Sequence, residues 1–407
     1  MRNIDKTLFA LAVVAMFAQQ PIPAQTVPTP DPLQGDGRVS GFYTWDGAIP
    51  AKPGTVLRSE PLPAIIGLPS ASSQTRLLYS STDGVGGKTP VAVSGVLFEP
   101  VGAPPPGGWP LIAWAHGTVG IADICAPSWA GRSYRDIAYL KAWLDQGYAI
   151  AATDYQGLGT PGPHPYLNVR AEAYGVLDAV RATLASHPRI ANKIVIIGQS
   201  QGAGAAFGAA SYAPQYAPEL NVLGTVATGV PYLKPGVQMA SSESHAVDPA
   251  LAYIFWLVLN MQQTDPTMSP SDLLMPAALP VFETARFNCV YEVESDITIL
   301  GLSDAVAERP TLDLALTKHL AEFAFPTVRL KQPIFIGTGT ADVDVPPSMQ
   351  EQLVKDACTA GTIVEAHLYK GLTHSQTFET SLRDSIPFVR NVIAGGPVTP
   401  VCSPQPE

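Results

Sequence analysis

The chain carries little charge and has no cluster of basic residues. Only 14% of its 407 residues are charged, and its formal net charge is −10. A nucleic-acid partner needs Lys and Arg side chains gathered along one face of the protein to contact phosphates. We therefore expect no nucleic-acid partner. Because 46% of the residues are hydrophobic, the chain can bury a large core.

Cysteine is scarce, and no CxxC pair occurs. The four cysteines are Cys125, Cys289, Cys358 and Cys402. Their spacing supports neither a zinc site nor a thioredoxin-like site, and we expect no metal and no organic cofactor. In an oxidising compartment an even number of cysteines favours two disulfides, and three pairings are possible. The order along the chain permits pairing of nearest neighbours but does not prove it.

Long hydrophobic runs are almost absent as well. Arg2 and Lys6 precede the apolar run LFALAVVAMFA, and PIPAQ then offers a cleavage site after Ala24. This is the pattern of a cleavable export signal, and the run is too short to span a bilayer. We therefore expect a signal peptide at 1–24, no transmembrane segment, and a secreted or periplasmic protein. The sequence predicts no oligomeric state.

The N-terminal part of the remaining chain is rich in proline. The segment TVPTPDPLQGDG predicts an extended tether, and we take 25–74 as an extended N-terminal segment. Residues 75–100 alternate apolar and polar side chains around a glycine-rich turn, which predicts a hairpin. The turn contains GVGGKT, which resembles a phosphate-binding loop. That loop would need glycine at Thr82 and a strand leading into a helix, so we interpret GVGGKT as a turn.

Strand and helix patterns alternate from residue 109 onward. Apolar strand patterns cover 109–118, 148–160, 193–198, 221–231, 332–343 and 362–371, and helical patterns cover 134–147, 170–186 and 376–394. Wholly apolar strands predict a parallel sheet that is covered on both faces. The interval 234–325 is mostly helical, which predicts a cap inserted into an α/β core at 75–233 and 326–407. Its apolar helix at 250–261 suits a ligand-facing surface and a buried core equally.

The stretch KIVIIGQSQGAG places Ser200 in a G-x-S-x-G motif between an apolar strand and a helix of small residues. A sharp turn from strand to helix strains the serine backbone, so its neighbours must lack side chains. The turn exposes the hydroxyl and points the N-terminus of the helix at negative charge that develops there. The motif thus predicts that Ser200 is a nucleophile. The alternative is a serine in an ordinary tight turn.

A serine nucleophile needs a histidine base and an orienting carboxylate, which follow it in the order acid, then histidine. Four histidines follow Ser200. His245 and His319 belong to the predicted cap, and His367 alternates within a strand. His374 comes directly after the last strand, so we predict that it is the base.

The loop after the strand at 332–343 offers two candidates for the acid. Asp342 comes first beyond the turn and is our choice, but a bend in the loop would exchange it for Asp344. Asp304 and Asp313 lie in the predicted cap and are less suitable.

An oxyanion hole needs two backbone N–H groups that point at the same place. One should be that of Gln201, the residue after the nucleophile. The other should come from the loop His116-Gly117-Thr118, and we favour Thr118. We expect His116 to shape the loop.

Several blocks of sequence together resemble a known family. They are WAHGTVGIADICAPS, ATDYQGLGTPGPHPYL, GQSQGAG, GTADVDVP and GLTHS, in this order between about residues 75 and 402. The chain resembles the secretory lipases of the α/β-hydrolase superfamily, the group that includes Candida antarctica lipase A. The resemblance implies an α/β-hydrolase fold, with a mostly parallel sheet, helices on both faces and an inserted helical cap.

The resemblance also implies site residues. The family's nucleophile, acid and base fall on Ser200, Asp342 and His374. Its oxyanion donors fall on Gln201 and the loop at Thr118, where the yeast lipase has an aspartate in place of this bacterial-looking HGT. It further implies the disulfides Cys125–Cys289 and Cys358–Cys402.

We therefore expect a secreted carboxylic ester hydrolase, a lipase or an esterase, that acts on a small-molecule or lipid ester through an acyl-enzyme. One alternative is a serine peptidase or amidase of the same fold, since a triad does not distinguish esters from amides. Against it, we see no propeller-like repeats before the core and no acidic cluster in the cap to bind a peptide amine. The other alternative is a non-catalytic binding protein, which the intact triad candidates oppose.

Overall fold

The structure is a computed structural model that describes residues 37–235 and 245–407. The predicted signal peptide at 1–24 lies outside the described residues, and so does the proline-rich start of the following segment. Among the described helices, none is both long enough and apolar enough to cross a membrane.

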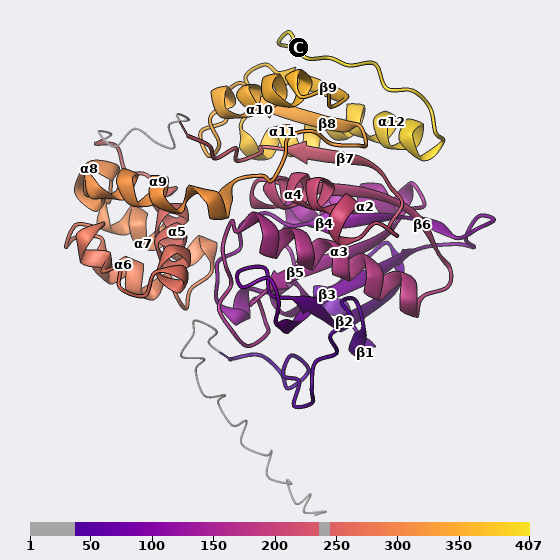
Figure 1. Cartoon of the computed structure of the whole chain (residues 1–407), viewed down its shortest axis with the longest axis horizontal. Coiled ribbons are helices and arrows are strands. Elements are labelled where there is room, and N and C mark those ends of the chain that lie inside the picture. Colours follow the sequence, from indigo (N-terminus) through magenta and orange to yellow (C-terminus); the bar gives the residue numbers. More distant parts are fainter. Residues whose placement is uncertain (1–36, 236–244) are drawn as a thin grey trace, which may run out of the picture.

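The described residues contain a nine-stranded sheet in the order β1-β2-β3-β5-β4-β6-β7-β8-β9 (Figure 1). The strands are β1 (Val56–Pro61), β2 (Ala71–Thr82), β3 (Pro90–Pro100), β4 (Trp109–Ala115), β5 (Ala149–Gln156), β6 (Ile190–Gln199), β7 (Val222–Thr228), β8 (Ile334–Gly339) and β9 (Val364–Tyr369). The pairs β1–β2, β2–β3 and β3–β5 are antiparallel, and the other five pairs are parallel. The predicted mostly parallel sheet is confirmed.

Helices cover both faces of this sheet, as predicted. One face carries α2 (Tyr134–Asp145), α11 (His374–Thr380) and α12 (Leu382–Ile393), and the other carries α3 (Val169–Ser186), α4 (Gln201–Tyr216) and α10 (Pro347–Thr359). The side chains of β4 point alternately to the two faces of the sheet. Leu111 packs with the α3–α4 side, and Ile112 and Trp114 pack with the α2–α12 side. The inner strands are mostly apolar because both of their faces are largely buried.

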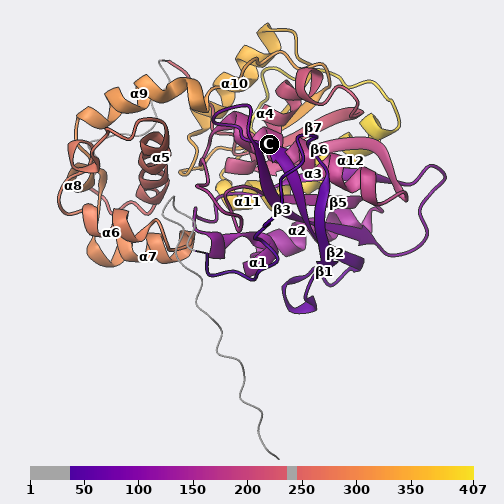
Figure 2. The ribbon, with the colours of Figure 1, turned by 60° about the horizontal axis from the view of Figure 1, so that its bottom comes forward.

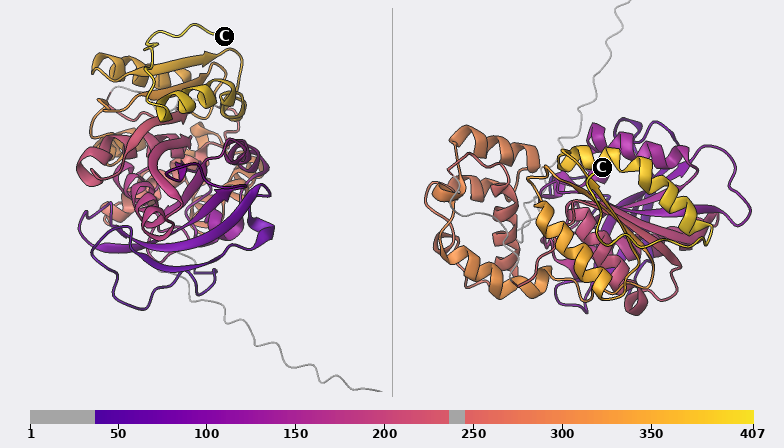
Figure 3. Two further views of the ribbon diagram at one scale, coloured as in Figure 1. Left: turned by 90° about the vertical axis from the view of Figure 1, so that its right-hand side faces the viewer. Right: turned by 90° about the horizontal axis from the view of Figure 1, so that it is seen from above.

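A group of helices lies apart from the sheet, between β7 and β8 in the sequence (Figures 1 and 2). These helices are α5 (Leu251–Thr264), α6 (Leu279–Thr284), α7 (Val290–Leu300), α8 (Asp304–Ala307) and α9 (Thr311–Phe323). The view from above in Figure 3 shows the same separation. We call this group the cap. Its central helix α5 contributes both to the buried core and to the wall of a cavity, because Phe255 and Trp256 are fully buried while Leu257 lines the cavity.

Two features of the fold differ from the sequence-based expectation. The segment before residue 75 contributes β1 and the start of β2. This edge strand was not predicted because its sequence, VLRSEP, does not alternate apolar and polar residues. The helix expected at 376–394 is two helices that meet at Ser381, whose hydroxyl donates to the Phe378 carbonyl. The first of them already begins at His374, because Thr373 and Gln376 form a capping box there.

Both disulfides that the resemblance implied are confirmed. Cys125–Cys289 joins the loop after β4 to the start of α7, and Cys358–Cys402 joins α10 to the C-terminal segment. Beside the first disulfide, the Val290 N–H donates to the Val119 carbonyl at 2.9 Å. The cap is therefore anchored next to the loop that follows β4.

Candidate active site

Ser200 occupies the turn between β6 and α4 with a φ of 60°, which is unusual for a residue with a side chain. The glycines beside it are required by space. A Cβ on Gly198 would lie 1.9 Å from the Gly202 carbonyl oxygen, and one on Gly202 would lie 2.0 Å from the Ala115 carbonyl oxygen. Ser200 therefore lies in the strained strand-to-helix turn that the motif predicts.

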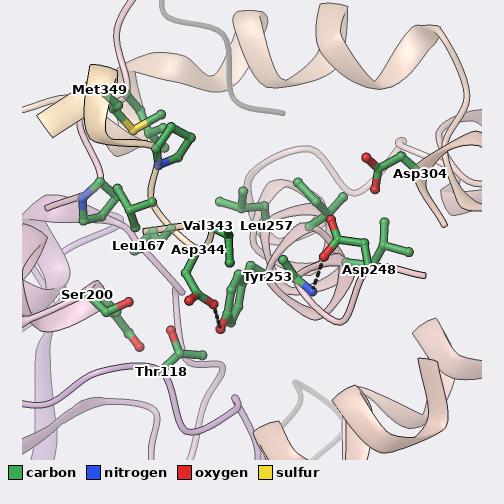
Figure 4. A pocket seen from close by; sticks show the side chains of 18 of the residues that line it. Thr118, Leu167, Ser200, Asp248, Tyr253, Leu257, Asp304, Val343, Asp344 and Met349 are labelled. Atoms are coloured by element: carbon green, nitrogen blue, oxygen red, sulfur yellow. Dashed lines mark hydrogen bonds between the residues drawn. The ribbon is translucent and has the colours of Figure 1, made fainter. Parts of the chain in front are cut away.

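The register of the sheet brings the loop after β4 beside this turn. Ala115 pairs with Gly198 in the parallel ladder, and a Cβ on Gly117 would lie 3.7 Å from the Ser200 Cβ. Gln201 is the first residue of α4, so its N–H has no acceptor within the helix. Thr118 lines the same cavity as Ser200 (Figure 4). The two predicted oxyanion donors thus lie close to Ser200.

Asp342 lies in the loop after β8, and its carboxylate accepts four hydrogen bonds. Its Oδ1 accepts from the N–H groups of Asp344 and Val345, at 3.0 and 2.9 Å. Its Oδ2 accepts from Nε2 of Gln350 at 2.9 Å and from Nδ1 of His374 at 2.8 Å. Because Nδ1 of His374 donates, the neutral ring has its lone pair on Nε2.

His374 also lies close to the serine turn. A Cβ on Gly229 would lie 2.4 Å from Cε1 of His374, and the preceding residue, Thr228, accepts a hydrogen bond from the Ser200 N–H at 3.0 Å. Nε2 of His374 is buried and has no hydrogen-bond partner among the described residues. The ring thus rests on the end of β7, the strand next to the one that carries Ser200.

The competing acids have other partners. Oδ1 of Asp344 accepts from the Tyr253 hydroxyl at 3.2 Å, and both side chains face the cavity (Figure 4). Asp304 lies on the cap side of the same cavity, and Asp313 lies in the first turn of α9. Asp342 is the acid that the structure brings to His374.

The other histidines after Ser200 lie elsewhere. His319 pairs with Glu322 at 2.8 Å in the cap, His367 pairs with Glu407 at 2.7 Å, and His245 is exposed. His116 is buried, its Nδ1 donates to the Gly117 carbonyl at 2.7 Å, and burial lowers its pKa. This contact stabilises the loop that carries Thr118.

Sequence analysis missed a link between the loops that carry Ser200 and His374. Arg135 of α2 donates to Oε1 of Gln199 at 3.1 Å and to Oγ of Ser375 at 3.0 Å. Its guanidinium also lies over the ring of Phe378. Arg135 thus connects the residue before Ser200 to the residue after His374. Nothing in a helix pattern marks this arginine, because its partners are distant in the sequence.

A second missed feature is a buried carboxyl behind the serine turn. Glu172 lies on α3 and accepts a hydrogen bond from Nε2 of Gln201 at 2.7 Å. The same amide nitrogen lies 3.0 Å from Nε2 of His164. Burial raises the pKa of Glu172 to about 8 and lowers that of His164 to about 3. A glutamate on the apolar face of the predicted helix, between Ala171 and Ala173, is the signal that was available in the sequence.

Ser200 opens into a cavity of about 650 Å³ between the sheet and the cap (Figure 4). Most of its wall is apolar, and the apolar side chains include Leu167, Leu233, Leu251, Ile254, Leu257 and Met349. Its carboxyl groups are Asp248, Asp304, Glu308 and Asp344, and none of its described lining residues is Lys or Arg. The expectation that the cap has no acidic cluster was wrong, because Asp248 lies far from Asp304 and Glu308 in the sequence and meets them only in the fold.

Burial and like charges raise the pKa values of two carboxyl groups on the cap side of the cavity, Asp304 and Glu308. Burial and the negative charge of Asp248 raise the pKa of Asp304 to about 6. Burial, followed by the charges of Asp304, Asp313 and Asp248, raises the pKa of Glu308 to about 7. This wall therefore gains negative charge as the pH rises through neutrality.

In the part of the chain that the structure describes, two groups of side chains have the spacing of a metal site. Ligand atoms of Asp342, Asp344 and His374 lie within 4.8 Å of one another, as do those of His367, Asp384 and Glu407. In the first group, both oxygens of Asp342 already accept hydrogen bonds, two of them from backbone N–H groups. These donors occupy the directions that a metal ion would need, so the arrangement does not fit a metal.

Comparison with known proteins agrees with this geometry. Residues 133–268, about a third of the chain, match the family model described as secretory lipase. The predicted resemblance is confirmed. Lipase A of Moesziomyces aphidis is 24% identical over 392 residues, which covers 89% of this chain and 81% of that protein. A probable inactive lipase of Mycobacterium tuberculosis is 31% identical over 191 residues, which covers 43% of this chain and only 41% of that protein.

The similarity to solved structures concerns the fold. The crystal structure of Candida antarctica lipase A in its closed state superposes with a TM-score of 0.71 at 21% identity, covering 90% of this chain and 89% of that one. At this identity the similarity establishes the architecture, and the α/β-hydrolase fold of the chain is confirmed. The activity rests on the site itself.

Proposed function

We propose that the protein is a secreted carboxylic ester hydrolase in which Ser200, His374 and Asp342 form the catalytic triad. The observation that carries the proposal is the hydrogen bond from Nδ1 of His374 to the fully hydrogen-bonded Asp342, next to the strained turn at Ser200. A buried, oriented imidazole beside a serine hydroxyl is the arrangement that makes the hydroxyl nucleophilic.

In the proposed reaction, the Ser200 oxygen attacks the ester carbonyl while Nε2 of His374 takes its proton. Asp342 holds the imidazole in the required tautomer and stabilises its charged form. The N–H groups of Gln201 and Thr118 stabilise the oxyanion, an effect worth about 3–4 kcal/mol for one donor. His374 then protonates the leaving alcohol. Water releases the acid from the acyl-enzyme by the same steps in reverse order.

The substrate class follows from the cavity that begins at Ser200. Its apolar lining suits the acyl chain of an ester. The two disulfides support an oxidising compartment, and we propose export through the signal peptide at 1–24.

Hydrolysis of p-nitrophenyl esters from acetate to palmitate tests the proposal, with a Ser200→Ala variant as the control. We expect turnover that the substitution abolishes, and the chain-length optimum distinguishes an esterase from a lipase. Turnover of the variant equal to that of the unchanged protein would contradict the triad.

The acidic residues of the cavity favour amide hydrolysis as a second candidate function. Asp248, Asp304, Glu308 and Asp344 would attract a substrate with an amine. Parallel assays with p-nitroanilides of basic and neutral amino acids test this candidate. A relative that is described as probably inactive gives a reason to test the binding-protein alternative too. A fluorophosphonate probe that labels the protein, but not Ser200→Ala, would exclude that alternative.

A further inference from the structure

Glu172 is a buried carboxyl that the proposed mechanism does not use. It is 1% exposed, and its Oε1 accepts two hydrogen bonds, from Nε2 of Gln201 at 2.7 Å and from the N–H of Leu167 at 2.9 Å. Gln201 supplies one of the proposed oxyanion donors through its backbone. Leu167 lines the cavity together with Ser200 (Figure 4). One carboxyl thus connects the wall of the cavity to the start of α4.

The orientation of the Gln201 amide follows from its second partner. Nδ1 of His164 donates to the Gln156 carbonyl at 2.8 Å, so Nε2 of His164 carries a lone pair and needs a donor. Among the described residues, the NH₂ group of Gln201 meets this need, and it lies 3.0 Å away. The two amide hydrogens of Gln201 are therefore directed to Glu172 and His164. The side chain is fixed between helix α3 and the loop that precedes it.

Fixing this side chain matters because Gln201 is the first residue of α4. An oxyanion donor stabilises the transition state only if it is already aimed at the position of the developing charge, and a displacement of about 1 Å can cost a factor of 100 in rate. The backbone of Gln201 follows the strained Ser200, so a contact that holds its side chain also holds its N–H group.

We propose that Glu172 is a positioning residue that stabilises the oxyanion hole through the Gln201 side chain. The neutral form of Glu172 is the form that supports catalysis. The inference rests on the proposed ester hydrolase function. In the neutral form Oε1 still accepts both hydrogen bonds, and Glu172 itself places no negative charge behind the oxyanion. The ionised form places a buried charge of the same sign near it, which disfavours the transition state.

The pH range follows from the groups around Glu172. Burial raises its pKa to about 8. The titratable groups that face it are His164, Tyr155 and Tyr166. Burial lowers the pKa of His164 to about 3 and raises the pKa values of both tyrosines above their ordinary values. Of these four groups, only Glu172 changes its charge between about pH 4 and pH 10.

The test is the pH profile of kcat and KM for p-nitrophenyl butyrate between pH 6 and pH 10. We expect kcat of the unchanged protein to fall several-fold as the pH rises through about 8. Glu172→Gln keeps the accepting oxygen without the charge, so its kcat at pH 7 should stay within about twofold and the alkaline fall should disappear. Glu172→Leu removes both hydrogen bonds and should lower kcat about tenfold with little change in KM.

Asp178→Asn is the matched structural control. Asp178 is a fully buried carboxyl on the same helix, but it accepts from Ser81, Tyr216 and Arg181 and does not contact Gln201. This substitution should lower the melting temperature and leave kcat and its pH profile unchanged. A double variant, Glu172→Leu with Gln201→Ala, tests the path of the effect. Residues that act through one contact give a double variant no worse than the more damaging single one.

The outcomes separate this inference from the function on which it rests. An alkaline fall that persists in Glu172→Gln, or additive losses in the double variant, would overturn the role of Glu172. Activity that depends on Ser200 but is unchanged in Glu172→Leu would do the same while leaving the ester hydrolase intact. Activity that does not depend on Ser200 would instead overturn the proposed function.

Discussion

Nδ1 of His374 donates to Oδ2 of Asp342 at 2.8 Å, across 32 positions of sequence and between the ends of β8 and β9. The carboxylate that receives this bond is held by three further donors. It cannot rotate without losing them, so the imidazole has one preferred orientation. Asp344, two residues later, points into the cavity and bonds to Tyr253.

This geometry predicts unequal effects of two substitutions. Asp342→Asn should lower kcat about 10³–10⁴-fold, because an amide in place of the carboxylate no longer fixes the tautomer or stabilises the imidazolium. Asp344→Asn should lower kcat less than about threefold, since it lies outside this hydrogen-bonded pair. Steady-state kinetics on one ester at pH 8 compares them. A larger loss of kcat in Asp344→Asn than in Asp342→Asn would mean that Asp344 is the acid of the triad.

Two glycine substitutions, Gly229→Ala and Gly204→Ala, should distinguish an effect on catalysis from an effect on stability. Gly229 has a φ of 64°, and a Cβ there would lie 2.4 Å from His374. Gly229→Ala should therefore displace the ring and lower kcat at least about 100-fold. Gly204 lies within α4 with space for a methyl group, 3.4 Å from Pro231, so Gly204→Ala should add about 0.5–1 kcal/mol of stability and preserve kcat. Kinetics and melting temperatures of both variants test the pair, and unchanged kcat in Gly229→Ala would place His374 elsewhere.

The acidic wall of the cavity predicts that the folded state weakens as the pH rises. Burial and like charges raise the pKa values of Asp304, to about 6, and Glu308, to about 7. A carboxyl group whose pKa is higher in the folded state than in the unfolded state contributes its full stabilisation below its unfolded pKa, near 4. It loses that contribution as the pH rises through 7. Glu308→Gln should raise the melting temperature at pH 8 by on the order of 1 °C and change it less at pH 5. Equal shifts at both pH values would argue against this linkage.

We expect the two disulfides to differ in their effect on kcat. Cys125–Cys289 joins the cap to the loop after β4, whereas Cys358–Cys402 ties the C-terminal segment to α10. Replacing either pair by serine should cost about 2–5 kcal/mol of stability. Only the first replacement should also lower kcat at a temperature where both variants are folded, because it loosens the Thr118 loop. Denaturant unfolding and kinetics measure both effects, and an equal fall in kcat would contradict the distinction.

The sequence by itself determined the elements whose cause is local. The strand, the strained Ser200 and the helix of small residues follow from steric limits between neighbours, as the contacts of Gly198 and Gly202 demonstrate. Apolar strands alternating with amphipathic helices likewise predicted the covered parallel sheet. The order of strand ends then pointed to Asp342 and His374, which the structure brings together.

Only the tertiary structure decided which distant groups meet. It brought Asp342 rather than Asp344 to His374, placed Glu172 behind Gln201, and gathered Asp248 and Glu308 in one cavity. It also added β1 to the edge of the sheet. None of these contacts leaves a periodic signal, because each depends on loop paths and strand register that many residues determine together. Steric limits act between consecutive residues and can therefore be inferred from the sequence. The pairing of side chains across a fold is established only once the core has packed.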